Sequence, residues 1–151
     1  MPAPLSRACR LGVALLTVAC APSAGAPTVQ YFPNPSSTPP RPFSQSVRVG
    51  HMLYLSGQIG TDRTGQVVSG GIDPETRQTL DTIRDALATA GSSMDRVVKC
   101  TVMLADMQEW GRVNTIYATY FPVHLPARSA IGANGLALGA RVEIECWATV
   151  P

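Results

Sequence analysis

Arg141-Val142-Glu143-Ile144-Glu145 decides the fold class of this chain, because its side chains alternate between charged and apolar. The charged residues would lie on one face of a β-strand and the apolar residues on the other. Such a strand packs one face against a core and leaves the opposite face open. The sequence therefore predicts a sheet that is covered on one side.

A second short apolar run begins at Pro126-Ala127-Arg128-Ser129-Ala130-Ile131. Arg128, fixed on a strand, would present a permanently charged fork that can bind a carboxylate through two hydrogen bonds. Glu143, on a rigid strand, could orient and deprotonate a water. A plainer interpretation makes Arg128 a salt-bridged surface residue and the glutamates a solvated sheet face. The residues alone favour the plainer interpretation and leave both open.

The overall charge argues against a nucleic-acid partner. The chain has 151 residues, with 12 basic and 10 acidic side chains. Arg7 and Arg10 lie in the N-terminal leader, so ten basic and ten acidic residues remain after Cys20. Nucleic-acid binding draws most of its affinity from clustered lysine and arginine. Lys99 is the only lysine, which removes most options for Schiff-base chemistry.

Residues 1–20 have the pattern of a signal peptide. Arg7 and Arg10 precede a short apolar run from Leu11 to Ala19, which is a charged region followed by a hydrophobic one. This run is too short to span a bilayer permanently. We therefore expect export to the bacterial periplasm.

The end of this leader, Leu16-Thr17-Val18-Ala19-Cys20, resembles a bacterial lipobox. Cys20 would then be the lipidated first residue of the mature protein and its only membrane contact. Thr17 stands where leucine or valine is usual. Simple secretion, with cleavage near Ser23 to Gly25, is the alternative.

Residues 21–42 are rich in proline, serine and threonine, a composition typical of a tether. Thr28 to Phe32 could add an edge strand. Residues 43–151 would form the folded domain. It begins with a hairpin of Ser46 to Val49 and Met52 to Ser56, joined by the turn Gly50-His51.

Two amphipathic helices follow. The first would begin with Asp73 as N-cap and Pro74 at the first helical position, and Gly91 would end it. A capping box of Asp106 and Glu109 would open the second. The expected apolar stripes are Leu80, Ile83, Leu87 and Ala90 in the first helix, and Met107, Trp110, Val113, Tyr117 and Tyr120 or Phe121 in the second.

The remaining strands would be Arg96 to Ala105, Ser129 to Ala133 and Arg141 to Thr149. The order β-β-α-β-α-β-β predicts an α+β fold with both helices on one face of a mixed sheet. The other face would stay uncovered and carry charge. We expect other copies of the chain to complete it, with pockets where the subunits meet.

The cysteines of the domain, Cys100 and Cys146, both fall on apolar strand faces. On the first of these strands, Val98, Cys100, Val102 and Leu104 should share the buried face. We expect free thiols that pack as small hydrophobes, with a disulfide as the alternative that export would allow. His51 and His124 are isolated, so no metal site is expected.

Five segments, in order and spacing, resemble the RidA (YjgF) family. They are Pro42-Phe43-Ser44-Gln45-Ser46-Val47, Leu55-Ser56-Gly57-Gln58-Ile59, Val113-Asn114, Pro126-Ala127-Arg128-Ser129 and Val142-Glu143-Ile144-Glu145. The resemblance extends from about Val29 to the C-terminus. It departs from the usual pattern at Phe43, where the family often has tyrosine, at Ala130, where cysteine is common, and at Asn134.

The resemblance implies a chorismate-mutase-like fold, a homotrimer and ligand pockets between subunits. Members of the family hydrolyse 2-imino acids and enamines, such as 2-iminobutanoate and 2-aminoacrylate, without a cofactor. Arg128 would bind the substrate carboxylate and Glu143 would position the attacking water. The backbone at Ser56 and Gly57 would contact the ligand, and Phe43 and Asn114 would shape the pocket.

Two other functions compete with the deaminase. A trimer of the same family could bind small carboxylates through Arg128 without turning them over. A ribonuclease or translation inhibitor has also been attached to parts of the family, but the neutral domain and the export signal weigh against it.

Overall fold

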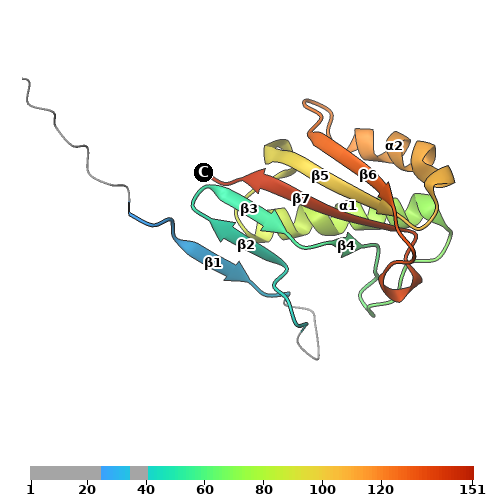
Figure 1. Cartoon of the computed structure of the whole chain (residues 1–151), viewed down its shortest axis with the longest axis horizontal. Helices are drawn as coiled ribbons and strands as arrows, with labels where there is room; N and C mark the ends of the chain where they lie inside the picture. Colours follow the sequence, from blue (N-terminus) through green and yellow to red (C-terminus); the bar gives the residue numbers. More distant parts are fainter. Residues whose placement is uncertain (1–24, 35–40) are drawn as a thin grey trace, which may run out of the picture.

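The structure is a computed structural model that describes residues 25–34 and 41–151. Its single sheet has the strand order β1-β2-β3-β7-β5-β6, and β4 pairs with β7 off this path (Figure 1). The strands are β1 (Val29–Phe32), β2 (Ser46–Val49), β3 (Met52–Leu55), β4 (Gln58–Ile59), β5 (Val97–Leu104), β6 (Ala127–Gly132) and β7 (Val142–Thr149). The α-helices are α1 (Ile72–Thr89) and α2 (Trp110–Thr119).

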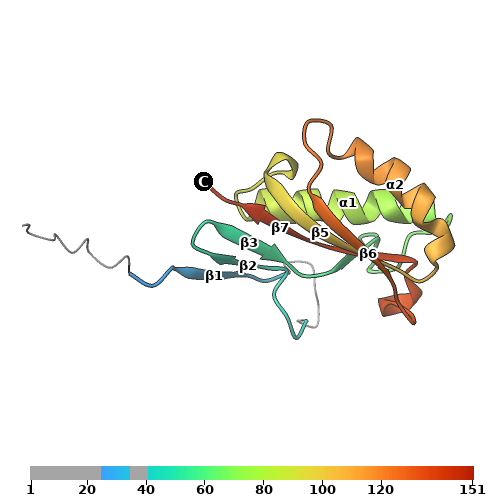
Figure 2. The ribbon, with the colours of Figure 1, turned by 45° about the horizontal axis from the view of Figure 1, so that its top comes forward.

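Both helices lie on one side of this mixed sheet, as Figure 2 shows. Strands β5 and β6 run parallel and are joined through α2, whereas the other pairs are antiparallel. Leu80, Ile83 and Leu87 of α1 are fully buried, as are Val142 and Ile144 of β7. The predicted α+β architecture, with both helices on one face, is confirmed.

Helix α1 begins two residues earlier than its sequence signals indicate, at Ile72 and not at Pro74. Gly71 is the N-cap, with no side-chain cap bond. Asp73 lies inside the first turn, where a carboxylate suits the helix dipole, and it pairs with Arg112 at 3.0 Å. The predicted N-cap role of Asp73 is therefore wrong. Gly91, with a φ of 78°, ends the helix as expected.

The start of α2 differs from the predicted capping box. Asp106 accepts a hydrogen bond from the backbone of Gln108, but it caps a 3₁₀ turn, Met107–Glu109, that precedes α2. Glu109 forms an ion pair with Arg141 at 2.6 Å and gives no reciprocal cap. The predicted stripe is half right: Val113 and Tyr117 are buried, whereas Met107 and Trp110 are 45% and 44% exposed.

A β-bulge explains why one buried strand position was predicted wrongly. The ladder between β5 and β7 shifts register between Val97 and Lys99. Val97 therefore points into the core, while Val98 is 43% exposed. A bulge inserts one extra residue and breaks strict alternation, so the face predicted to include Val98 starts at Val97 instead.

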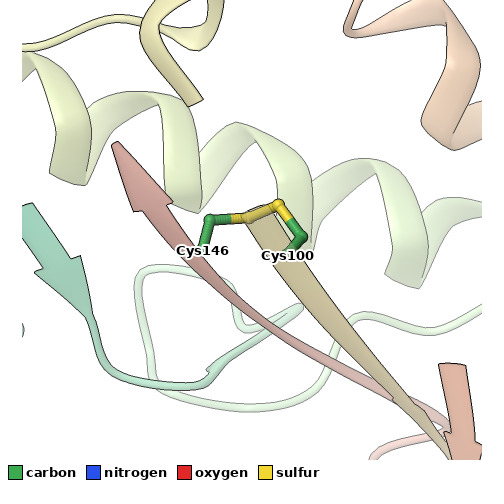
Figure 3. The surroundings of a disulfide bond; sticks show 2 residues. All are labelled: Cys100 and Cys146. Atoms are coloured by element: carbon green, nitrogen blue, oxygen red, sulfur yellow. A yellow bond between two sulfur atoms is a disulfide. The ribbon is translucent and has the colours of Figure 1, made fainter. Parts of the chain in front are cut away.

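The expectation of free thiols is also wrong, because Cys100 and Cys146 form a disulfide (Figure 3). They are directly paired across β5 and β7, with their Cα atoms 4.1 Å apart, and both are fully buried. The bond links the two strands at the centre of the sheet. Its formation depends on a pairing between residues 46 positions apart, which local sequence does not reveal.

The segment before residue 43 contributes a strand to the sheet. β1 pairs antiparallel with β2, and Tyr31 lies opposite Val47. Cys20 and the rest of the leader lie outside the described residues. Within the described ranges, no helix is both long and apolar enough to cross a membrane.

Removing the disulfide should destabilise the fold strongly. We expect the double variant Cys100→Ala, Cys146→Ala to lose about 3–4 kcal/mol of unfolding free energy, because a long loop is no longer constrained in the unfolded chain. Urea unfolding measures the loss, and reduced wild-type protein separates the covalent contribution from packing. In the full-length chain unfolded without reductant, only Cys9 and Cys20 should be reactive thiols, and two further reactive thiols would contradict the bond.

Candidate functional site

Arg128 is held on the helix-covered side of the sheet. In the β5–β6 register it lies beside Cys100, whose side chain is buried in the core. Its Nη2 donates to Asn114 Oδ1 of α2 at 2.5 Å. Across residues 25–34 and 41–151 no carboxylate forms an ion pair with Arg128, although three other arginines have such partners. The guanidinium therefore keeps donors free for an external anion.

Tyr117, one turn after Asn114, lies against the guanidinium. Arg128 Cζ is 4.8 Å from the centroid of the Tyr117 ring, within the range of a cation–π contact. Burial raises the pKa of the Tyr117 hydroxyl to about 12, although the charge of Arg128 acts in the opposite direction. This hydroxyl has no hydrogen-bond partner in the described part of the chain, and an unmet buried hydroxyl costs about 1–3 kcal/mol. We call Arg128, Asn114 and Tyr117 the anchor half-site.

Glu143 lies on the open face of the sheet, half-buried beside Gly57 and Glu145. A Cβ atom added to Gly57 would collide with the Glu143 carboxylate, so a side chain at this position would push the acid out of its present place. Burial, and to a lesser extent the charge of Glu145, raise the pKa of Glu143. A carboxylate with a raised pKa is a stronger base once it is ionised. We call Glu143, Gly57 and Ser56 the base half-site.

The backbone beside Gly57 connects Phe43 to the base half-site. Ser56 Oγ donates to the carbonyl of Ser44 at 2.8 Å, and Ser56 N donates to the carbonyl of Gln45. Phe43 is 50% exposed, and Arg41 lies over its ring at 5.8 Å. An exposed ring next to this tied segment can form the wall of a pocket but cannot donate a hydrogen bond.

The structure separates the two half-sites within one chain. Glu143 alternates with Val142 and Ile144, which face the helices, so its side chain points to the opposite side. In register, Glu143 pairs with Met103 of β5, which pairs with Ile131 of β6, three residues beyond Arg128. Strand spacing and rise place the two Cα atoms roughly 14 Å apart. A small ligand cannot touch both groups of one chain.

Glu75 is a buried carboxylate that sequence reasoning missed. It is 2% exposed, and its Oε1 accepts from the backbone N–H groups of Arg141 at 2.6 Å and Val142 at 3.1 Å. Gly60 packs directly against it. Glu75 thus fixes the first residues of β7, immediately before Glu143. A glutamate in the first turn of a helix indicates by itself only a favourable interaction with the helix dipole, so local sequence does not reveal this role.

A cavity of about 860 Å³ lies elsewhere, between α1 and the loop around Asp62. Its lining is mostly polar and includes Arg41, Arg63 and Asp85, but none of the residues of either half-site. The volume of this cavity is therefore no evidence that it is the functional site. Within the described ranges, no group of three histidine, cysteine or acidic side chains is placed to hold a metal ion.

The fold and these residues define a class: a small α+β domain with a free strand-borne arginine and a raised-pKa glutamate. The family model described as Endoribonuclease L-PSP matches residues 35–150. The chain belongs to this family, which is the RidA/YjgF family.

Curated relatives carry deaminase names. The chain is 48% identical over 108 residues to the 2-iminobutanoate/2-iminopropanoate deaminase of Mus musculus, which covers 71% of this chain and 80% of the relative. The human protein of the same name is 45% identical over 71% of this chain and 79% of its own length. The Reactive Intermediate Deaminase A, chloroplastic, of Arabidopsis thaliana is 41% identical over 72% of this chain and 59% of its length.

Solved structures share the fold. The yeast protein Mmf1 superposes with a TM-score of 0.75 at 32% identity, over 82% of this chain and all of that one. The YjgF gene product of E. coli gives a TM-score of 0.67, also at 32% identity, over 72% of this chain and 87% of that one. These similarities bear out the RidA-like fold expected from the sequence.

Replacing Glu143 with glutamine should stabilise the protein at neutral pH. Because the pKa of Glu143 is raised above its ordinary value of 4.5, the folded chain holds this proton more tightly than the unfolded chain does. Wild-type stability relative to the variant is then greatest below pH 4.5 and falls as the pH rises through the raised pKa. Thermal unfolding across this range measures the difference.

The control is Asp95→Asn, which removes an equal charge from an exposed position. The difference between the two pH profiles isolates the contribution of Glu143. A wild type that instead gained stability over Glu143→Gln between acid and neutral pH would contradict a raised pKa.

Proposed function

We propose that the chain is a cofactor-independent deaminase. Its substrates would be small 2-imino acids and their enamines, such as 2-iminopropanoate, 2-iminobutanoate and 2-aminoacrylate, and its products 2-oxo acids and ammonia. The names of relatives at 41% to 48% identity support this reaction.

One observation carries the proposal for the site: Arg128 is half-buried and has no acidic partner among residues 25–34 and 41–151. Asn114 takes one N–H of Nη2 and Tyr117 covers one face. The remaining N–H groups match the planar geometry of a carboxylate. Every 2-imino acid carries such a carboxylate next to the reacting carbon, so this contact fixes the position of that carbon.

Glu143 then supplies the base. Its carboxylate accepts a proton from a water while the water oxygen forms a bond to the carbon of the protonated imine. The proton returns to the nitrogen of the resulting carbinolamine. The C–N bond then breaks with its electron pair on nitrogen while the hydroxyl oxygen forms the carbonyl and gives its proton to Glu143. Ammonia leaves a 2-oxo acid and takes up the proton from Glu143, which restores the carboxylate. The imine is already electrophilic, so positioning and one general base, worth about 10²–10⁴-fold, are sufficient.

A homotrimer would unite the half-sites. Since one chain places Arg128 and Glu143 on opposite faces of its sheet, a complete site requires the anchor half-site of one copy and the base half-site of another. The open face has exposed rings suited to such contact, including Tyr54 and Trp147, which pack edge to face at 5.3 Å. Closed symmetry would create three equivalent sites.

Steady-state kinetics test the two roles. With imines generated from amino acids by an amino-acid oxidase, Glu143→Gln should lower kcat about 10²–10⁴-fold, because the base is lost while the shape is kept. Arg128→Ala should raise KM at least tenfold, because charged hydrogen bonds are each worth about 1.5–3 kcal/mol. Full activity of the arginine variant would refute the anchor role.

The second candidate is a trimer that binds small carboxylates without turning them over. Phe43 favours it, because its exposed ring has no hydroxyl to offer a ligand. Retained binding of 2-oxobutanoate, with imine decay no faster than in buffer for wild type and Glu143→Gln alike, would select this function. For the ribonuclease function in the family description, the equal numbers of basic and acidic residues after Cys20 give no support.

Export to the periplasm, with a lipid on Cys20, is also part of the proposal. The charged and apolar leader supports it. The buried Cys100–Cys146 disulfide adds support, because such bonds persist mainly in oxidising compartments.

Lipidation has a direct test. Full-length protein expressed in a bacterial host should incorporate radiolabelled palmitate and fractionate with membranes, and Cys20→Ala should abolish both. Cys9→Ala, which changes a cysteine of the same leader and leaves the lipobox intact, is the matched control and should keep the label. An exported but unlabelled wild type would indicate simple secretion, and a wild type retained in the cytoplasm would refute export.

A further inference from the structure

Helix α2 holds the Arg128 side chain by contacts that do not themselves involve a substrate. Arg128 makes two contacts with α2: a hydrogen bond to Asn114 and a face-on contact with the ring of Tyr117. Asn114 and Tyr117 are three residues apart, so they lie on the same side of the helix. The hydrogen bond to Asn114 fixes one edge of the guanidinium, and the Tyr117 ring fixes the orientation of its plane.

The Tyr117 ring is itself rigidly held. The residue is 3% exposed, and its ring lies 4.7 Å from the ring of Phe121, centroid to centroid, at an interplanar angle of 42°. Its hydroxyl forms no hydrogen bond among the described residues. The ring, not the hydroxyl, therefore makes the contact that reaches Arg128.

We propose that Tyr117 is a positioning residue: its ring is a fixed surface that orients the Arg128 guanidinium for carboxylate binding. The negative face of the ring replaces water on one side of the cation. The free edge of the guanidinium is then held in one plane before the substrate arrives, which lowers the cost of ordering this long side chain on binding. The inference rests on the proposed function only in that the bound group is a carboxylate.

A substrate carboxylate bound by Arg128 is present in the ground state and in the transition state alike. A residue that orients Arg128 should therefore change KM and carboxylate affinity more than kcat. Replacing a residue that has only a packing role would lower the stability of the fold without changing KM more than kcat. The two roles can be separated by measurement.

The experiment uses Tyr117→Phe, Tyr117→Leu and a ring-fluorinated phenylalanine at position 117. Each is tested for imine turnover and for binding of 2-oxobutanoate by calorimetry. Tyr117→Phe keeps the ring and should stay within about twofold of wild type in both. Tyr117→Leu should raise KM and Kd about five- to thirtyfold, with a smaller change in kcat. This loss of affinity matches the strength of a partly desolvated cation–π contact.

The fluorinated ring keeps the shape but weakens the negative face, so it should weaken binding relative to Tyr117→Phe even if Tyr117→Leu does not fold. Tyr120→Leu is the matched control: Tyr120 lies at the end of α2, but its hydroxyl bonds to Asp81. It should leave KM unchanged. Equal binding by the fluorinated and unfluorinated rings, or a loss in Tyr117→Phe as large as in Tyr117→Leu, would overturn the inference.

Binding and turnover distinguish this inference from the proposed function. Wild type that binds 2-oxobutanoate without hydrolysing imines would refute the deaminase, whereas weaker binding by Tyr117→Leu would still support the positioning role. Wild type that binds no carboxylate would refute both.

Discussion

The pleat of β7 is the constraint on which the site depends. Alternate side chains of a strand point to opposite faces, so Val142 and Ile144 enter the core while Glu143 points away from the helices. The strand cannot slide, because Glu75 binds its first backbone N–H groups and the disulfide at Cys146 ties it to β5. A one-residue slip would exchange the two faces. The position of the proposed base is therefore set by the core and not by contacts with a substrate.

Arg128, on β6, lies on the other face of the sheet, next to α2. With the anchor half-site on one face of the sheet and the base half-site on the other, a single chain would not form the complete site that we propose. The Glu143 carboxylate lies close to Gly57 and has a raised pKa, and the buried Tyr117 hydroxyl has no hydrogen-bond partner in the part of the chain that the structure describes. Features that cost stability collect at functional sites, and here they occur in both half-sites.

Local sequence was sufficient for the elements but not for their pairings. The alternation around Glu143 and the apolar stripe of α1 follow from periodicity, and both are as expected. The bulge at Val98 and the partnership of Cys100 with Cys146 depend on how β5 aligns with β7, which no local pattern reveals.

Long-range partners also account for the roles of Glu75 and Glu109. Each carboxylate could be explained within its own helix, but their partners lie at the start of β7, far along the chain. Arg128 and Glu143 could be named from motifs, yet their separation across the sheet needed the register of three strands.

The central claim is that a working site takes its arginine from one copy and its glutamate from another. Subunit mixing tests it most directly: Arg128→Ala and Glu143→Gln are unfolded together, refolded and assayed at a substrate concentration well below KM, where each variant alone has little activity. In a random closed trimer about a quarter of the shared sites would contain both native residues, so about a quarter of wild-type activity should return. A mixture as inactive as its components, with mixed assemblies shown to form, would contradict the account.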